Sequence, residues 1–552
     1  MKKTAKVLCL LLAVLMLATL AAACDKNEGD TSSAATSNAT SSGGGNSGFR
    51  LEKKDWDGVT INILTHNKRE HAFYEFGTLA QETEIKSDNV STAFQERTNL
   101  LEQEYGIKTQ VHFTEEGLGA PTNEIEQQIL AGLSDYDLVA DGVQSLTKLG
   151  TQEYFWNYYE LDNGYIDLNA DYWDQSAIEA LSIANHLYYI TGEAIVSDNA
   201  ATWAMYYNKD LLADNDLQNP VELVDAGTWT IDALYEMCKA VATKVSTGDT
   251  MSYDPADGDI WGMVSQAYDG LAFMWGAEQS MITKDEDDLP IMRIENERNV
   301  SAWQKISAML YDKSCVGVAD LFGPWSETYA KESQIFTNGN AAFMPGAITV
   351  LDGETMDNAD INFGILPMPK LDVDQEEYST SCTVYWATFF SIPTSNVEKL
   401  DATCYLLEAM GYYGQEMCTY EYYDKTLKLK KMDDPEDERM LDLLFQNRTF
   451  DLGAVYDWAG PTAGMLQFYT SMIGSQSSEI ISVYESKRDS FQDAIDATID
   501  TFTKYRSSKK GEPISVRPFF VFGLPLTGTL RLALCRALCR RLLAACRGCA
   551  AA

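Results

Sequence analysis

Hydrophobic and polar residues follow two alternating periods along the first half of the chain. Short β-prone runs at 59–64, 108–113 and 136–142 alternate with longer stretches of helical character at 89–105 and 123–133. This alternation of strand and helix is typical of a parallel α/β sheet. We therefore predict an α/β fold in which polar residues at the carboxyl ends of the strands border a ligand crevice.

The same alternation resumes in the segment from 187 to 241. A β-prone run at 187–191 is followed by small polar residues and a second apolar run at 203–207. Thr230 is a favourable N-cap for the helix that follows, and Asp232 suits the positive end of its dipole. Apolar residues then recur at helical spacing, at Ile231, Leu234, Tyr235, Cys238 and Val241. The segment is predicted to form a strand, a crossing, a second strand and an amphipathic helix.

Composition and charge narrow the class of protein. The chain has 552 residues, of which 45% are hydrophobic and 11% aromatic, so most of it is expected to be globular. Its formal net charge is −40 and its pI is near 4.3. Nucleic acid is excluded as an expected partner, because binding to phosphates requires a basic surface.

The N-terminus has the features of an export signal. Lys2, Lys3 and Lys6 precede an apolar stretch at 7–20 that is short for a membrane-spanning helix, and small residues lead to Cys24. We predict a signal peptide at 1–23, lipidation of Cys24, and a flexible tether at 24–50 that is rich in Ser, Thr, Asn and Gly. The alternative is an ordinary signal peptide with Cys24 near its cleavage site.

The C-terminal segment 511–552 is an atypical, basic and Cys-rich tail. From Pro513 onward it contains no acidic residue, although the rest of the chain is strongly acidic. Three interpretations stay open: a basic helix lying on anionic lipid, a metal site at Cys546 and Cys549, and a segment foreign to the domain. None of these interpretations makes the tail part of the predicted α/β fold.

Signatures of several enzyme classes are missing from the sequence. The chain has no GxSxG elbow and no GxxxxGK[ST] loop, and His66 and His71 lack the i, i+4 spacing of a zinc helix. We expect no cofactor and no metal site. The five cysteines at 238, 315, 382, 404 and 418 are an odd number, which excludes a complete set of disulfides among them.

Three short sequence motifs occur in order between residues 206 and 238: YYNKDLL, NPVEL and GTWTIDALYEMC. Together they resemble the extracellular solute-binding proteins of ABC importers, family 1, which are sugar-binding lipoproteins related to the maltodextrin-binding protein. The resemblance extends over about residues 57–508. It implies that this stretch lies where the chain first passes from one lobe to the other.

The resemblance also implies a domain organisation. We expect a type II periplasmic-binding-protein-like fold with two discontinuous lobes joined by hinge crossings. Residues 51–194 and 340–384 would form lobe 1, and residues 195–339 and 385–510 would form lobe 2. The second and third crossings are expected near 336–346 and 384–393.

A carbohydrate site needs aromatic rings that stack on CH faces and planar polar groups that bind hydroxyls. Of the residues that the resemblance places at the cleft, we favour Trp203, Asp141 and Trp458 most strongly. The complete set of predicted ligand-binding residues is His66, Asn67, Asp141, Gln144, Asn199, Thr202, Trp203, Tyr268, Asp269, Tyr385, Trp386 and Trp458.

The function implied is capture without chemistry. A small carbohydrate, an oligosaccharide by default, would be bound by hinge closure and passed to the membrane subunits of an ABC permease. The protein would be a monomer, lipid-anchored at the outer face of the cell membrane. Two alternatives remain open: a membrane-tethered glycoside hydrolase and a sugar-sensing lipoprotein that does not transport.

Overall fold

The computed structural model describes residues 48–508, apart from 67–74, 77–88, 115–116, 353–355, 357–358, 360, 424–426 and 428–433. The predicted signal peptide, Cys24, most of the tether, Asn67 and the C-terminal tail lie outside the described residues. Within the described part of the chain, no helix has both the length and the apolar character needed to cross a membrane.

The first β-sheet has four strands in the order β12-β3-β1-β2. Its strands are β1 (Val59–His66), β2 (Ile107–Thr114), β3 (Leu138–Gly142) and β12 (Thr388–Ser391). The central strand β1 runs parallel to both β2 and β3, whereas β12 is antiparallel to β3. All residues of β3 are buried, as the continuous apolar run around it predicted.

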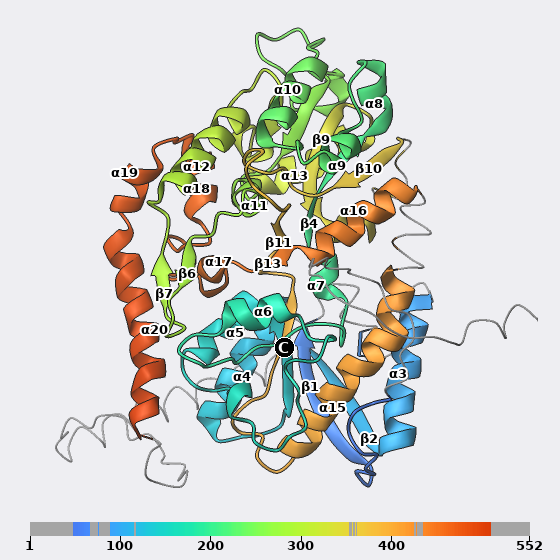
Figure 1. Ribbon diagram of the computed structural model, residues 1–552, viewed down its shortest axis with the longest axis vertical. Helices are drawn as coiled ribbons and strands as arrows, with labels where there is room; N and C mark the ends of the chain where they lie inside the picture. Colours follow the sequence, from blue (N-terminus) through green and yellow to red (C-terminus); the bar gives the residue numbers. More distant parts are fainter. Residues whose placement is uncertain are drawn as a thin grey trace, which may run out of the picture. The chain divides into compact units, whose positions relative to one another are not determined.

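Helices pack beside this sheet in two groups (Figure 1). One group is α3 (Asn89–Tyr105) and α15 (Leu400–Tyr413), and the other is α4 (Ala120–Ala131) and α5 (Val143–Gly150). The sequence prediction of a helix at 89–105 is confirmed by α3. Between the two sheets in the chain come the short helices α6 (Gln175–Leu181) and α7 (Ser197–Ala200).

The second sheet has five strands in the order β10-β4-β9-β5-β8. Its strands are β4 (Trp203–Asn208), β5 (Trp261–Ser265), β8 (Val316–Val318), β9 (Ala341–Ala347) and β10 (Phe363–Leu366). β9 is parallel to β5 and antiparallel to β4, and β5 is parallel to β8. The carboxyl ends of β5 and β9 and the beginning of β4 therefore lie at the same edge of the sheet.

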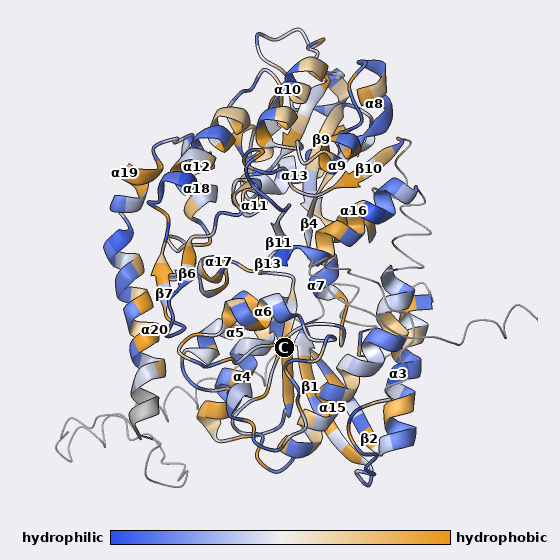
Figure 2. Ribbon diagram, viewed as in Figure 1, coloured by the Kyte–Doolittle hydropathy of each residue, from blue (hydrophilic) through white to orange (hydrophobic). Residues whose placement is uncertain are grey.

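Seven helices among the described residues accompany the second sheet. They are α8 (Lys209–Asp214), α9 (Pro220–Asp225), α10 (Ile231–Val241), α11 (Asp269–Gly276), α12 (Glu297–Leu310), α13 (Trp325–Thr337) and α16 (Pro435–Gln446). In α10, the Thr230 side chain accepts a hydrogen bond from the backbone N–H of Ala233, which confirms the predicted N-cap. Figure 2 shows the expected contrast between hydrophobic strands such as β10 and hydrophilic stretches on helices such as α8.

The remaining strands and several further α-helices lie outside the two large sheets. They are the parallel pair β11 (Thr380–Ser381) and β13 (Arg448–Thr449), the antiparallel pair β6 (Ile282–Lys284) and β7 (Pro290–Met292), and the helices α17 (Leu452–Tyr456), α18 (Phe468–Ser475), α19 (Ile480–Glu485) and α20 (Arg488–Ser508). The five cysteines within the described residues are buried and free. They pack as small apolar side chains.

The passages between the sheets differ from the predicted lobe assignment. We expected 340–384 in the first lobe, but β9 and β10 both hydrogen-bond within the five-stranded sheet, on either side of β4. We expected 385–510 in the second lobe, but β12 pairs with β3 in the four-stranded sheet. The chain therefore passes from the second sheet back to the first sheet between β10 and β12. The reason is that β9 supplies both edges of its backbone to β4 and β5, which holds it in the middle of the second sheet.

A third passage follows α15. This helix packs against β1 of the first sheet, whereas the next long helix, α16, packs against β10 of the second. Three passages therefore connect the two sheets. The crossing predicted near 336–346 is wrong, because β9 of the second sheet occupies this stretch, and the chain passes to the first sheet only after β10. The boundaries of the lobes stay a prediction.

Candidate functional site

A narrow pocket lies at the edge where β5 and β9 end and β4 begins, and its cavity volume in this structure is only about 10 Å³. Three aromatic side chains, Trp203, Tyr329 and Trp386, line it together with residues of α13 and of the end of β9. Trp386 comes from the turn that precedes β12 of the other sheet, so elements attached to both sheets form the walls. The remaining lining residues are Gln266, Glu332, Ser333, Met344, Pro345, Gly346, Ala347 and Val350.

The orientation of the Trp203 indole is set by a buried carboxylate. Its Nε1–H donates to Oδ1 of Asp269 at 3.0 Å, and the other carboxylate oxygen accepts hydrogen bonds from the Ser265 hydroxyl and the Gln266 backbone, both at 2.8 Å. Burial raises the pKa of Asp269 to about 7. Asp269 thus acts as a positioning residue that holds the ring of Trp203 at the pocket wall.

Behind Trp203, aromatic rings form a continuous layer. The Tyr268 ring lies 5.1 Å from that of Trp203, 5.9 Å from that of Trp275 and 6.3 Å from that of Tyr385, measured between centroids. Edge-to-face and tilted contacts of this kind hold the rings rigidly in place. The structure thus brings together Trp203, Tyr268, Asp269, Tyr385 and Trp386, five of the twelve predicted residues.

Glu332 of α13 is a residue of this pocket that the sequence prediction missed. Its side chain is 2% exposed, and its Oε2 has no hydrogen-bond partner among the described residues. Burial raises the pKa of Glu332 well above its usual range, and the neighbouring carboxyls of Asp269 and Asp320 raise it further. Burial therefore favours the protonated carboxyl, which can donate a hydrogen bond into the pocket.

A sequence signal for Glu332 does exist. It occupies the buried stripe of α13 together with Thr328, Ile335 and Phe336, at helical spacing. A charged residue within an apolar stripe is rarely buried without a function or a partner. Tyr329, which also lines the pocket, lies beside this stripe and carries no comparable signal.

The turn that carries Tyr385 and Trp386 approaches the end of β3 closely. A Cβ atom on Gly142 would lie 2.5 Å from the carbonyl oxygen of Tyr385, so only glycine fits here. The Tyr385 hydroxyl accepts a hydrogen bond from the Gln467 amide at 3.0 Å. Gln144 hydrogen-bonds to the Asp457 carboxylate nearby, and its backbone N–H donates to Val384 at 3.3 Å. Gln144 thus supports the turn.

Asp141, which is predicted to bind the ligand, instead forms hydrogen bonds within the protein. Its carboxylate accepts hydrogen bonds from the backbone N–H groups of Gly119, Thr122 and Gly142 and from the Thr122 hydroxyl. It is fully buried and satisfies the N-terminus of α4. His66 is also buried, at the carboxyl end of β1. Asn67 lies outside the described residues.

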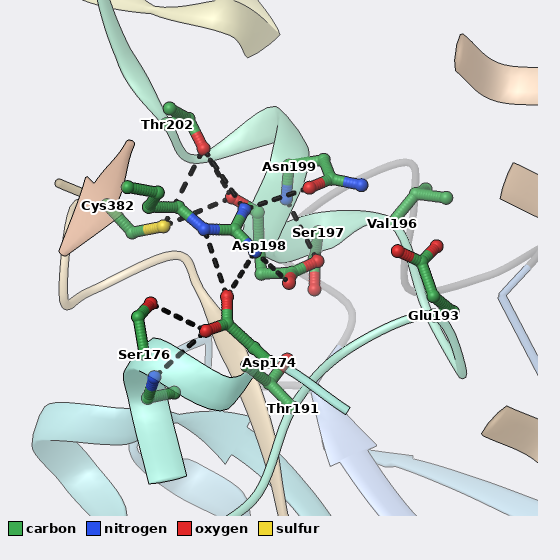
Figure 3. Close-up of polar contacts among 12 residues, drawn as sticks. Asp174, Ser176, Thr191, Glu193, Val196, Ser197, Asp198, Asn199, Thr202 and Cys382 are labelled. Atoms are coloured by element: carbon green, nitrogen blue, oxygen red, sulfur yellow. Dashed lines mark hydrogen bonds and ion pairs between the residues drawn. The ribbon is translucent and has the colours of Figure 1, made fainter. Parts of the chain in front are cut away.

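Asn199 and Thr202 belong to a buried ion cluster at the passage between the sheets. Figure 3 shows them beside Asp174, Asp198 and Cys382. The Arg448 guanidinium donates to Asn199 Oδ1 at 2.8 Å, to Thr202 Oγ1 at 3.3 Å and to Asp198 Oδ2 at 2.9 Å. It also contacts the Asp174 carboxylate, through Nε at 3.1 Å. These side chains bind one another and leave little capacity for a ligand.

Arg448 itself was missed by the sequence prediction. It joins Asp174, which caps α6, to Asp198 of α7, so its contacts hold the segments on either side of the first passage together. Its hydrogen-bond partners lie more than 240 positions away in sequence; Asn199, for example, is 249 positions before it. No local pattern could therefore have indicated this role.

Trp458, which is also predicted to bind the ligand, does not line the pocket. Its ring stacks on Tyr456 with centroids 5.0 Å apart, and its Nε1–H donates to the Thr498 hydroxyl of α20 at 2.9 Å. With 5% of its side chain exposed, it anchors the C-terminal helix. Among the described residues, no group of three or more His, Cys, Asp and Glu could hold a metal ion.

Comparison with solved structures identifies the fold. A Mycobacterium tuberculosis protein, UspC, matches 80% of this chain and 100% of its own length, with 12% identity and a TM-score of 0.50. A Rhizobium etli sugar transporter protein in an open conformation matches 81% and 99% of the two chains, with 13% identity and a TM-score of 0.50. An ABC substrate-binding protein of Listeria monocytogenes, solved with cycloalternan, matches 82% and 100%, with 14% identity and a TM-score of 0.48.

Comparison of sequences identifies the family. No curated protein sequence matches the chain significantly. The family described as bacterial extracellular solute-binding protein, by contrast, matches residues 94–410, which is more than half of the chain. This family consists of binding proteins and not of enzymes, so the glycoside hydrolase alternative is set aside. The α/β fold of periplasmic binding proteins and the family match agree, and the chain belongs to the bacterial extracellular solute-binding proteins.

Proposed function

We propose that this protein is the substrate-binding lipoprotein of an ABC importer. It captures a carbohydrate, by default an oligosaccharide, between two lobes and delivers it to a membrane permease. The maltose-bound protein of Thermotoga maritima and the cycloalternan-bound protein of Listeria monocytogenes, both similar in fold, are relatives whose ligands are of this class.

The observation that carries this proposal is the chemistry of the aromatic pocket. Two indoles and a phenol, Trp203, Trp386 and Tyr329, offer flat apolar surfaces for the CH faces of a sugar. Gln266 can both donate to and accept from hydroxyls, and the protonated Glu332 can donate to a hydroxyl oxygen. The pocket lining contains no cation, so an anionic solute would find no counter-charge there.

The origin of the pocket walls supports capture by closure. Trp386 belongs to the turn before β12 of one sheet, whereas Trp203 begins β4 of the other. A ligand held between these two indoles would stabilise whichever arrangement brings them together, which is the thermodynamic basis of hinge closure.

The experiment that tests the proposal is a thermal-shift screen of the full-length chain against a panel of sugars and polyols. A sugar that binds only the folded protein raises its melting temperature. We expect an oligosaccharide to give a shift that Trp386→Ala removes and Trp458→Phe retains. Equal shifts in the two variants would contradict the assignment of this pocket.

Membrane attachment is the second part of the proposal. The lipid would be carried by Cys24, which follows the predicted signal peptide. Cells fed a labelled fatty acid should incorporate the label into the wild-type protein, and Cys24→Ala should abolish both the label and the membrane association. Retention of the label in the variant would overturn this assignment.

A further inference from the structure

A second and larger pocket lies beside the β11–β13 pair. It has a cavity volume of about 390 Å³ and is bordered by the end of α11 and by the segments that contain β11 and β13. Its volume falls within the usual range for small-molecule sites of roughly 300–1,000 Å³. The lining residues are Trp275, Glu278, Gln279, Ser280, Glu377, Tyr378, Ser379, Asn447, Thr449, Phe450 and Asp451.

The two pockets are separated by the aromatic layer. Trp275 borders the second pocket and packs edge-on against Tyr268, whose ring in turn contacts Trp203 at the first pocket. The two pockets share no lining residue. A ligand in one would therefore not occupy the other.

The walls of the second pocket combine rings with small planar polar groups. Trp275, Tyr378 and Phe450 supply three aromatic side chains, and Asn447 and Gln279 supply amides. The Gln279 side chain is 3% exposed, and its amide N–H₂ donates to the carbonyl of Ala277 at 2.8 Å. Its Oε1 is buried and has no hydrogen-bond partner among the described residues. A buried acceptor without a partner is costly, and a hydroxyl donor from a ligand would satisfy it.

The charge of this lining restricts the ligand further. Glu278 and Glu377 are exposed at the rim and Asp451 is buried at the wall, while no Lys, Arg or His is among the lining residues. A phosphate, sulfate or uronate would be repelled, because like charges at close range disfavour binding. Carboxylates accept hydrogen bonds from hydroxyls, however, and so favour an uncharged polyhydroxylated ligand.

We propose that this pocket is a second carbohydrate site, which binds a neutral sugar unit between the end of α11 and the β11–β13 pair. Aromatic rings, a buried acceptor that lacks a donor, and an acidic rim each fit this ligand class. The proposal goes beyond the function assigned to the first pocket and does not depend on it.

The test is saturation-transfer NMR on the full-length chain with neutral sugars (glucose, maltose and ribitol) at millimolar concentration, and with glucuronate as an anionic comparison. Thr449 is exposed in the pocket, and Thr449→Trp would fill part of the space with an indole. Thr449→Ala is the matched control that leaves the space open, and Gln279→Leu removes the buried acceptor independently. Each change is made in wild type and in Trp386→Ala.

We expect a neutral sugar to bind the Trp386→Ala protein. Thr449→Trp and Gln279→Leu should each raise its Kd at least tenfold, whereas Thr449→Ala should change it less than twofold; glucuronate should give no signal. The proposal is overturned if no neutral sugar of the panel binds in the Trp386→Ala background, or if Thr449→Trp and Thr449→Ala behave alike. Loss of binding through Thr449→Trp alone, with Trp386→Ala silent, would support the second site and contradict the first.

Discussion

Two buried clusters of acidic and polar side chains meet at the start of β4, where Thr202 contacts one and Trp203 the other, yet the clusters differ in one respect. At the passage between the sheets, Asp174 and Asp198 face the Arg448 guanidinium, which is itself 8% exposed. At the aromatic pocket, Asp269 and Glu332 are buried with no cation among the lining residues. The first cluster is charged and internally satisfied, whereas in the second burial favours the protonated form of Glu332, whose Oε2 has no hydrogen-bond partner in the part of the chain that the structure describes.

The difference shows how the two sites divide their tasks. Because the Arg448 cluster satisfies its own groups, it stabilises the path of the chain between the sheets and has no need of a ligand. Because Oε2 of Glu332 has no hydrogen-bond partner among the residues that the structure describes, it gains most when a ligand supplies one. Polar residues near a passage are therefore not equivalent as ligand candidates.

The largest effect is expected from Arg448→Met. Removing the cation leaves two buried carboxylates uncompensated, which should lower the free energy of unfolding by about 3–5 kcal/mol. Urea denaturation measures this change. The control is Arg439→Met, whose pair with Asp225 is about half exposed and should contribute less than ~1 kcal/mol. Equal losses in both variants would show that the Arg448 cluster is no stronger than a surface pair.

The next effect is a pH dependence of stability at Glu75, which packs against the same passage. Its carboxylate accepts a hydrogen bond from the Val196 N–H at 2.9 Å, and burial raises its pKa from 4.5 to about 7. The folded state therefore holds this proton more tightly than the unfolded state. The stabilisation is complete below about pH 4.5 and is lost as pH rises through 7.

Glu75→Gln should remove this dependence, because the amide does not ionise. The full shift corresponds to about 3 kcal/mol between the two pH limits. Unfolding curves recorded from pH 4.5 to pH 8 would measure it, with Glu416→Gln, an exposed position, as the matched control. A wild-type slope that survives in Glu75→Gln would assign the dependence to other groups.

At the pocket, Trp386→Ala should lower the affinity for the captured sugar at least tenfold, or roughly 1.4 kcal/mol, with little loss of stability. Trp386 is only partly buried, so its removal leaves no large cavity. Trp458→Phe should do the reverse, since Trp458 holds α20 through Thr498. Isothermal titration and thermal unfolding of both variants separate the two roles.

The smallest expected effect sharpens the assignment of Glu332. In its protonated form it donates a hydrogen bond, so sugar affinity should weaken about threefold as the pH rises and the group ionises. Glu332→Gln keeps a donor and should abolish this pH dependence while changing the affinity at pH 7 little. Glu327→Gln, exposed on the same helix, should retain the dependence of the wild type.

Local pattern predicted the elements that build the two sheets. The helix at 89–105, the buried strand around 138–142 and the Thr230 cap agree with the structure, because each depends on neighbours within one or two turns. Sequence also led to Trp203, Tyr268, Asp269, Tyr385 and Trp386, which the structure brings together. It did not separate these from Asp141 and Trp458, which are equally polar or aromatic.

The sequence by itself determined the alternation of strand and helix, the family and the kind of side chain available to a ligand. Only the tertiary structure decided which of those side chains remain free for one. The physical reason is that many hydrogen bonds join residues that are distant in sequence. Asp141 is hydrogen-bonded to the N-terminus of α4, Asn199 to Arg448, and Trp458 to Thr498. Oε2 of Glu332 remains available in the pocket because no other described residue hydrogen-bonds to it.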